Sequence, residues 1–204
     1  MTVRQQWSVV LGVLAVLAGA LWAGTVVLHD ELHPISVGEH APEFSAVPVF
    51  EPVYPSAPGD TAFMSRPVAP GAPAHTLASY KGQVVLLNIW ATWCEPCRAE
   101  MPAIEQLHRE FGPRGLKVVS VSVDNAGDRN LIDKFVRDYH LTFEILHDAP
   151  GAIQRRYQTT GVPETFVLGR DGVIRKKVIG AADWSSQGNR ALIAQLLAED
   201  GGDR

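Results

Sequence analysis

Two cysteines, Cys94 and Cys97, are the residues whose type and spacing point most directly to chemistry, and the chain holds no others. They follow Val84–Trp90, a nearly unbroken apolar run with the length of a strand that is buried on both faces. An amphipathic helical pattern begins at Cys94, and Pro96 falls in its first turn, where the missing N–H costs nothing. The sequence therefore predicts a strand, a short turn and a helix that begins at the first cysteine.

This placement gives the two thiols different predicted environments. Unpaired N–H groups and the helix dipole stabilise a thiolate on Cys94, whereas Cys97 lies one turn deeper and is expected to be shielded. An exposed attacking thiol beside a buried resolving thiol is the arrangement that thiol–disulfide exchange requires.

Other uses of the cysteine pair fit the sequence less well. A structural disulfide across so short a loop removes little entropy from the unfolded chain and is easily reduced. Zinc would need two more ligands, and a covalent haem site would need His where Arg98 stands. The pattern favours redox chemistry with no metal and no bound cofactor. A copper-binding or scaffold module that uses both thiols as soft ligands is the alternative from another class.

The N-terminal region predicts a membrane anchor. Residues 7–28 form an uncharged apolar run that is long enough to cross a bilayer core. Arg4 precedes this run, whereas Asp30 and Glu31 follow it. The positive-inside bias therefore predicts a single-pass protein of the cytoplasmic membrane, with residues 1–6 in the cytoplasm and the rest of the chain in the periplasm.

A cleaved signal peptide is the alternative, because small residues around Ala20 resemble a cleavage site. The apolar run continues past that point, which favours a retained anchor. Residues 29–36 are predicted to be a tether to one domain at 37–204. Within this domain, residues 48–73 contain seven prolines and little periodicity, so we predict an extended or loop insertion there.

Strand and helix patterns alternate after the cysteines. Residues 117–123, in which β-branched residues dominate, and the short run 143–146 are predicted strands that flank helical spacing, which implies parallel strands joined by a right-handed crossover. Pro163 opens a further apolar strand, a position where proline is allowed. Asp171–Gly172 then predicts a hairpin turn into a last, antiparallel strand.

Three segments resemble one known family. Trp90–Pro102 is similar to the active-site segment of the thioredoxin superfamily and, more narrowly, of the membrane-anchored TlpA/ResA-like thiol–disulfide oxidoreductases. Val37–Phe44 resembles the segment that leads into the N-terminal hairpin of these proteins, and Gly180–Ser185 resembles a TlpA-like Gly-x-Ala-x-Trp segment. The resemblance implies an α/β thioredoxin fold, a central mixed sheet flanked by helices, with an N-terminal β-hairpin, a βα insertion and a preceding transmembrane helix.

The resemblance also implies roles for individual residues. Cys94 would be the nucleophile and Cys97 the resolving thiol. Pro163 would be a cis-proline opposite the first cysteine, with backbone groups of Val162 pairing to the partner chain. The same substrate groove would be lined by Trp93, Glu95 and Pro96.

Glu100 is the candidate acid or base. Asn88 stands where thioredoxins carry a buried aspartate, and an amide cannot accept the proton of the inner thiol. Glu100 lies three residues after Cys97, so both share a helix face, and ResA-like proteins carry glutamate there. The alternative is an ordinary glutamate on a solvated helix face.

Composition sets the remaining bounds. A chain of 204 residues with 46% apolar content can bury a full core, and a net charge of −4 gives no reason to expect nucleic-acid binding. We expect a monomer that reduces disulfides of extracytoplasmic proteins and is recharged by an upstream membrane electron donor. Copper-delivery proteins of oxidase assembly and apocytochrome c are candidate substrates. Glu95 beside Cys94 favours a reducing couple, and an oxidant that installs disulfides is the alternative.

Overall fold

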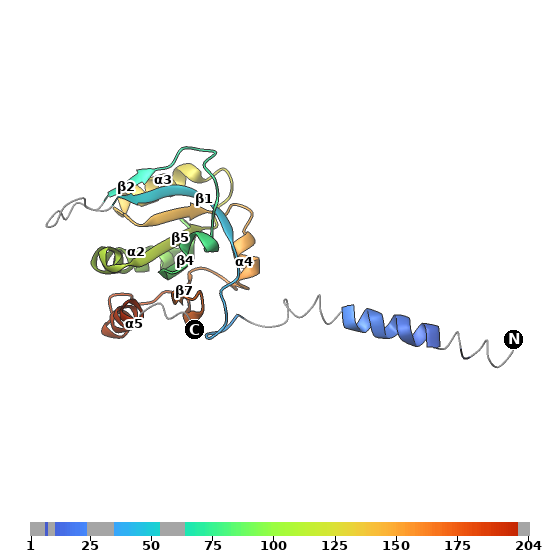
Figure 1. The fold of residues 1–204 in the computed structure, drawn as a ribbon. Coiled ribbons are helices and arrows are strands. Elements are labelled where there is room, and N and C mark those ends of the chain that lie inside the picture. Colours follow the sequence, from blue (N-terminus) through green and yellow to red (C-terminus); the bar gives the residue numbers. More distant parts are fainter. Residues whose placement is uncertain (1–6, 8–10, 24–34, 54–63, 200–204) are drawn as a thin grey trace. The chain divides into compact units, whose positions relative to one another are not determined.

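The structure is a computed structural model that describes residues 7, 11–23, 35–53 and 64–199 (Figure 1). It divides into two compact units, Met1–Ile35 and Ser36–Arg204. In the first unit, the described residues are almost all helical. Among all the described residues, no helix is long and apolar enough to cross a membrane. Residues 1–6 lie outside the described residues, and the predicted anchor and tether lie partly outside them. All three assignments stay predictions.

One mixed sheet organises the second unit. Its strand order is β2-β1-β6-β5-β4-β7-β8, and β3 pairs with β1 beside this path. The central strands β4, β5 and β6 are parallel, and β7 and β8 continue the sheet in antiparallel fashion. The strands are Ser45–Val53 (β1), Met64–Pro67 (β2), His75–Thr76 (β3), Val84–Trp90 (β4), Leu116–Ser122 (β5), Glu144–His147 (β6), Glu164–Leu168 (β7) and Ile174–Ile179 (β8).

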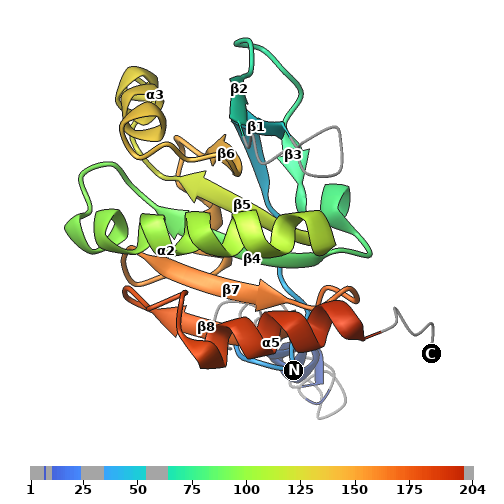
Figure 2. The same ribbon diagram turned by 90° about the vertical axis from the view of Figure 1, so that its left-hand side faces the viewer.

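Helices cover the sheet. Figure 2 shows α2 in front of β4 and β5 and α5 in front of β7 and β8, so the two helices share one face. The helices are Glu95–Phe111 (α2), Arg129–Asp138 (α3), Ala152–Arg156 (α4) and Gln187–Ala198 (α5), with short 3₁₀ turns at Leu77–Tyr80 (η1) and Gly112–Arg114 (η2). The predicted thioredoxin-like α/β fold is confirmed, including the parallel βαβ segment and the β7–β8 hairpin.

Strand β4 is the centre of the domain because both of its faces are covered. All seven of its residues are buried, and it pairs with β5 on one side and β7 on the other. Apolar side chains on both faces explain its continuous hydrophobic run. Asn88 is the one polar side chain in this strand, and its partners, described below, lie in the candidate active site.

The proline-rich segment corrects one prediction. Residues 48–53 and 64–67, expected to form an extended or loop insertion, belong to an antiparallel strand pair in which Phe50 faces Pro67 and Val53 faces Met64. Proline removes a donor from a ladder, so it is tolerated at sheet edges and irregularities. β2 is an edge strand, and the pairing of β1 with β6 shifts register next to Pro48. Pro48 therefore lies at an irregularity, and Pro67 in the edge strand, of the N-terminal hairpin that the family resemblance implied.

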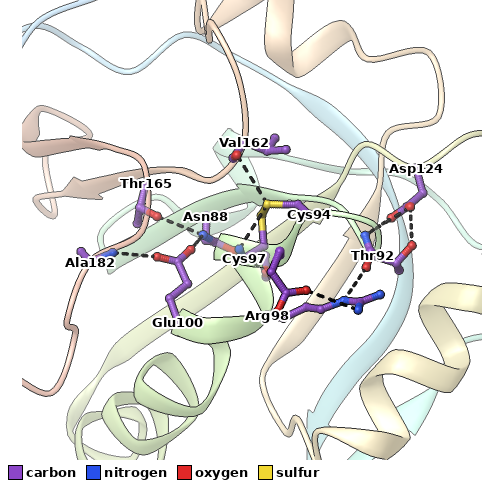
Figure 3. Close-up of a disulfide and its surroundings, with 12 residues drawn as sticks. Asn88, Thr92, Cys94, Cys97, Arg98, Glu100, Asp124, Val162, Thr165 and Ala182 are labelled. Carbon is purple, nitrogen blue, oxygen red and sulfur yellow. Dashed lines mark hydrogen bonds and ion pairs between the residues drawn. A yellow bond between two sulfur atoms is a disulfide. The ribbon is translucent and has the colours of Figure 1, made fainter.

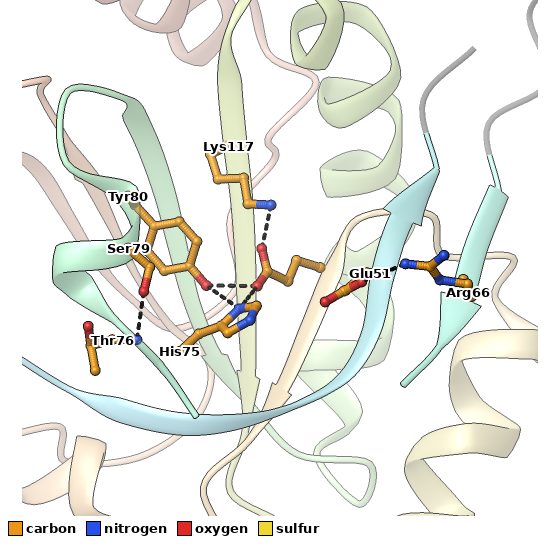
Figure 4. A network of polar contacts seen from close by, with 8 residues as sticks. Glu51, Arg66, His75, Thr76, Ser79, Tyr80 and Lys117 are labelled. Atoms are coloured by element: carbon orange, nitrogen blue, oxygen red, sulfur yellow. Dashed lines mark hydrogen bonds and ion pairs between the residues drawn. The ribbon is translucent and has the colours of Figure 1, made fainter. Parts of the chain in front are cut away.

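A buried carboxylate joins the segment that follows the hairpin, β3 and η1, to the central strands (Figure 4). Glu144 of β6 lies 2.5 Å from Nδ1 of His75, accepts a hydrogen bond of 2.8 Å from the Tyr80 hydroxyl and pairs with Lys117. Burial and the neighbouring Glu144 charge raise the pKa of Tyr80, so its hydroxyl stays protonated and donates. These contacts attach β3 and η1 to β5 and β6.

Candidate active site

The two cysteines form a disulfide at the N-terminus of α2 (Figure 3). Cys94 is the N-cap residue, and its sulfur accepts a hydrogen bond of 3.2 Å from the Cys97 amide. This geometry confirms the predicted helix start. The expected contrast in exposure is wrong for the oxidised state, because Cys94 is 4% exposed and Cys97 is fully buried. The cause is the segment that packs against the first sulfur.

That segment is the loop that enters β7. The peptide bond between Val162 and Pro163 is cis, as the resemblance implied. The Val162 carbonyl oxygen lies 3.4 Å from the Cys94 sulfur, and Gly180 donates to the Pro163 carbonyl at 2.8 Å. The loop is therefore held between β8 and the disulfide, and it covers the first cysteine.

Glu100 is buried, so the interpretation as a solvated helix glutamate is wrong. The residue is 2% exposed, and its carboxylate accepts three N–H groups, from the Asn88 side chain at 2.9 Å, the Ala182 backbone at 3.2 Å and the Trp184 indole at 3.3 Å. Burial raises the pKa of Glu100 above its ordinary value, and the three hydrogen bonds oppose part of that rise. The group is a carboxylate poised to hold or release a proton one helical turn from Cys97.

Asn88 positions this carboxylate. Its Nδ2 donates to Glu100 and to the Thr165 hydroxyl, each at 2.9 Å, and its Oδ1 accepts from the Ser120 hydroxyl at 2.9 Å. All four side chains in this network come from different elements, β4, α2, β7 and β5. The sequence indicated only that Asn88 cannot take a proton; the fold shows that it is a donor.

The predicted substrate-contacting residues surround the disulfide. Trp93 is 65% exposed, Glu95 and Pro96 are exposed, and Val162 is half-buried. Glu95 forms an ion pair with Arg98, because its carboxylate lies 3.6 Å from the guanidinium of that residue. The negative charge expected beside Cys94 is therefore partly offset, a contact that the sequence argument missed.

Sequence reasoning also missed a buried aspartate, Asp124, which contacts Thr92 just before the disulfide (Figure 3).

Among the described residues, no group of three or more His, Cys, Asp or Glu side chains could hold a metal ion. His29 and His33 do have the His-x₃-His spacing of metal ligands. They lie outside the described residues.

A mixed sheet with the disulfide at a helix N-terminus and a cis-proline against it defines a thiol–disulfide oxidoreductase of the thioredoxin fold, whose redox-active group is the Cys94–Cys97 pair. The AhpC/TSA family model matches residues 37–177, and the chain belongs to this family.

Curated relatives agree with this assignment. The chain is 32% identical to the thiol-disulfide oxidoreductase ResA of Oceanobacillus iheyensis over 168 residues. The aligned region covers 82% of this chain and 78% of that protein. It is 42% identical over 106 residues to the thioredoxin-like protein YneN of Bacillus subtilis, across 52% of this chain and 61% of that protein. The ResA-like resemblance is confirmed.

Solved structures share the fold. A thioredoxin-family thiol:disulfide interchange protein of Chlorobium tepidum superposes with a TM-score of 0.59 at 21% identity, over 80% of this chain and 99% of that chain. The thioredoxin domain of a thiol-disulfide oxidoreductase of Bacteroides vulgatus superposes with a TM-score of 0.60 at 16% identity, over 79% and 98%.

Proposed function

We propose that this protein is a reductase of disulfides in extracytoplasmic proteins, with Glu100 as the acid/base group of the resolving cysteine. The observation that carries the proposal is the buried Glu100 carboxylate, held by three N–H donors one turn from Cys97. A resolving thiol that is fully buried needs such a group, because desolvation opposes formation of its thiolate.

The reaction runs in two exchange steps. The thiolate of Cys94 attacks a substrate disulfide, forms a mixed disulfide and releases one substrate sulfur as a thiolate, which takes a proton from solvent. Cys97 then passes its proton to Glu100, and the resulting thiolate attacks the Cys94 sulfur. This step breaks the mixed disulfide, releases the second substrate thiolate and leaves the oxidised Cys94–Cys97 pair. Two electrons have moved to the substrate.

The charge balance near Cys94 supports the reducing direction. A carboxylate in the first turn of α2 opposes the helix-end stabilisation of a thiolate, and a less stabilised thiolate makes a more reducing couple. Glu95 supplies that carboxylate, and the contact with Arg98 reduces its effect without removing the charge. We expect a reduction potential nearer the roughly −270 mV of thioredoxin than the roughly −120 mV of a strong oxidant.

The setting of the reaction belongs to the same proposal. Residues 7–28 would anchor the protein in the cytoplasmic membrane, with the catalytic domain in the periplasm, on the strength of the uncharged apolar run and its flanking charges. Copper-delivery proteins of oxidase assembly and apocytochrome c are the proposed substrates, because each presents a pair of cysteines. A membrane dithiol donor would reduce the oxidised Cys94–Cys97 pair again. The protein would act as a monomer.

Trapping substrates on a Cys97→Ser variant tests the function directly. This variant can form the mixed disulfide but cannot resolve it, so periplasmic proteins with paired cysteines should be recovered in reducible complexes with it. Cys94→Ser is the matched control and should trap none. Equilibration of wild type with glutathione then decides direction, since a potential near the oxidant value would replace the reductase role with disulfide donation. Membrane fractionation of the full chain decides the anchor, and release of a shortened soluble protein would reject it.

A further inference from the structure

Thr92, two residues before the first cysteine, is fixed on both sides (Figure 3). Its amide and its hydroxyl both donate to the carboxylate of Asp124, at 3.0 Å and 2.6 Å. Its carbonyl accepts a hydrogen bond of 3.0 Å from Nε of Arg98, which lies on the first turn of α2. Every polar group of Thr92 therefore has a partner, and the partners come from opposite sides of the loop.

Asp124 is itself held firmly. It is 1% exposed and lies two residues beyond the end of β5. The Ser122 hydroxyl donates to its carboxylate at 2.6 Å, and the Val123 amide donates to the carbonyl of Trp90 at 2.9 Å. The carboxylate is thus fastened to the sheet next to the strand end from which the cysteine loop leaves.

The turn from Thr92 to the disulfide is short. The Cys94 amide donates to the Ala91 carbonyl at 3.2 Å, and the Cys94 sulfur then accepts the N–H of Cys97. Rotation of Thr92 would move Cys94 off the N-cap position and lengthen that last bond. The orientation of the first sulfur on the helix end depends on how firmly Thr92 is held.

We propose that Asp124 is a positioning residue for the attacking cysteine, acting through Thr92. The inference rests on the proposed exchange reaction, in which Cys94 attacks first. By fixing Thr92, Asp124 keeps the Cys94 sulfur at the end of α2, where backbone N–H groups stabilise its thiolate.

The chain contains a matched pair for comparison. Glu105 of α2 accepts both the amide of Thr142, at 2.8 Å, and its hydroxyl, at 2.6 Å. The geometry is that of Asp124 and Thr92, yet Glu105 lies eight residues beyond Cys97, about 12 Å further along the helix axis. Variants of this second pair should carry a similar structural cost without the effect on the cysteine.

Two neutral substitutions at Asp124 separate position from charge. Asp124→Asn can still accept the Thr92 amide through its carbonyl oxygen and donate to a neighbouring hydroxyl, so it keeps Thr92 fixed. Asp124→Ala removes both contacts to Thr92. Both variants lose the same negative charge, so a difference between them reports the positioning of Cys94 and not the field of the carboxylate.

The experiment measures the alkylation rate of Cys94 by iodoacetamide against pH in the reduced full-length protein, with thermal unfolding in parallel. The pKa of Cys94 should be about one unit higher in Asp124→Ala than in Asp124→Asn, so alkylation below that pKa is about tenfold slower. Thr92→Val should move in the same direction relative to Thr92→Ser. Glu105→Ala and Thr142→Val should lower the unfolding temperature and leave alkylation unchanged.

Equal Cys94 profiles in Asp124→Ala and Asp124→Asn, with only a loss of stability, would make Asp124 a purely structural residue. If Asp124→Ala does not fold, equal profiles in Thr92→Val and Thr92→Ser would overturn the proposal instead. Alkylation needs no protein substrate, so the result stands apart from the trapping and potential measurements that decide the reductase role.

Discussion

Replacement of Glu100 by glutamine tests the acid/base role most sharply, because the surrounding network can absorb the change. The carboxylate accepts Asn88 through one oxygen and Ala182 and Trp184 through the other. A glutamine can keep the second pair with its carbonyl oxygen, which turns its NH₂ group towards Asn88. The Asn88 amide can then rotate by half a turn, since the hydroxyls that contact it both donate and accept. Folding should therefore change little.

The rate of exchange should change much more. Without a group to take the Cys97 proton, resolution of the mixed disulfide should slow by about a hundredfold, at the low end of the range for general base catalysis. The wild-type rate should also rise with pH as Glu100 ionises. This rise should lie above pH 4.5, the ordinary pKa of a glutamate, because burial raises the pKa of Glu100. This limb of the pH–rate profile should be absent from the profile of Glu100→Gln, whereas the limb that reports ionisation of Cys94 should remain.

Stability against pH gives a second readout with a definite sign. A carboxyl group whose pKa is raised by folding keeps a proton that the unfolded chain has released, so its contribution to stability is complete below pH 4.5 and is lost as pH rises through the folded pKa. Glu100→Gln should flatten this loss.

The matched control for both readouts is Glu105→Gln, the same substitution at another buried position of α2. Stopped-flow reduction of a protein disulfide and denaturant unfolding measure the two effects. If Glu100→Gln matched both wild type and Glu105→Gln in rate at every pH, the base assignment would be refuted.

Three further outcomes follow from the described contacts. Trp184→Phe removes one N–H donor from Glu100, so the Glu100 limb of the rate profile should move to higher pH in the same stopped-flow assay. Glu95→Gln should make the couple less reducing in glutathione equilibration, by less than about 30 mV, because the side chain is exposed and paired with Arg98. Burial, with smaller effects from Lys117 and Arg109, lowers the pKa of His108 to about 4. Between pH 6.5 and 4 the unfolded chain therefore binds a proton at His108 that the folded chain does not bind. The unfolding free energy should fall by about 3 kcal/mol between pH 6.5 and 4, and His108→Leu should remove this slope in urea titrations.

Local signals were sufficient to predict the start of the catalytic helix. The apolar strand, the two cysteines and Pro96 all act within one or two turns of chain, and the structure confirms each of them. The prolines of β1 misled for the same reason: taken locally they disfavour a strand, whereas in the fold Pro48 lies next to a register shift in the pairing with β6 and Pro52 lies opposite Ser65 of the edge strand β2. Sheet position is a property of the whole fold.

Apart from the Glu95–Arg98 pair, the missed contacts are those between distant parts of the chain. Thr92 and Asp124 are 32 residues apart, and nothing near either one indicates the other. The fold supplies the reason for the contact: Thr92 and Asp124 follow the neighbouring parallel strands β4 and β5, and the carboxyl ends of such strands meet at one edge of the sheet. For Glu100 the local signal was the helix face that it shares with Cys97, whereas its partners Ala182 and Trp184 approach it from a loop after β8 and were not predicted.

The pairing of Asn88 with Glu100 explains why the strand carries an amide. A carboxylate at position 88 would face the Glu100 oxygen across the 2.9 Å that now separates donor and acceptor, and two buried like charges at that distance cannot both ionise. With the amide on β4, the carboxylate on α2 gains a donor instead of a competitor. Its pKa then also depends on donors from the loop that carries Trp184, so the proton affinity of Glu100 is set jointly by the sheet and by the segment that leads into α5.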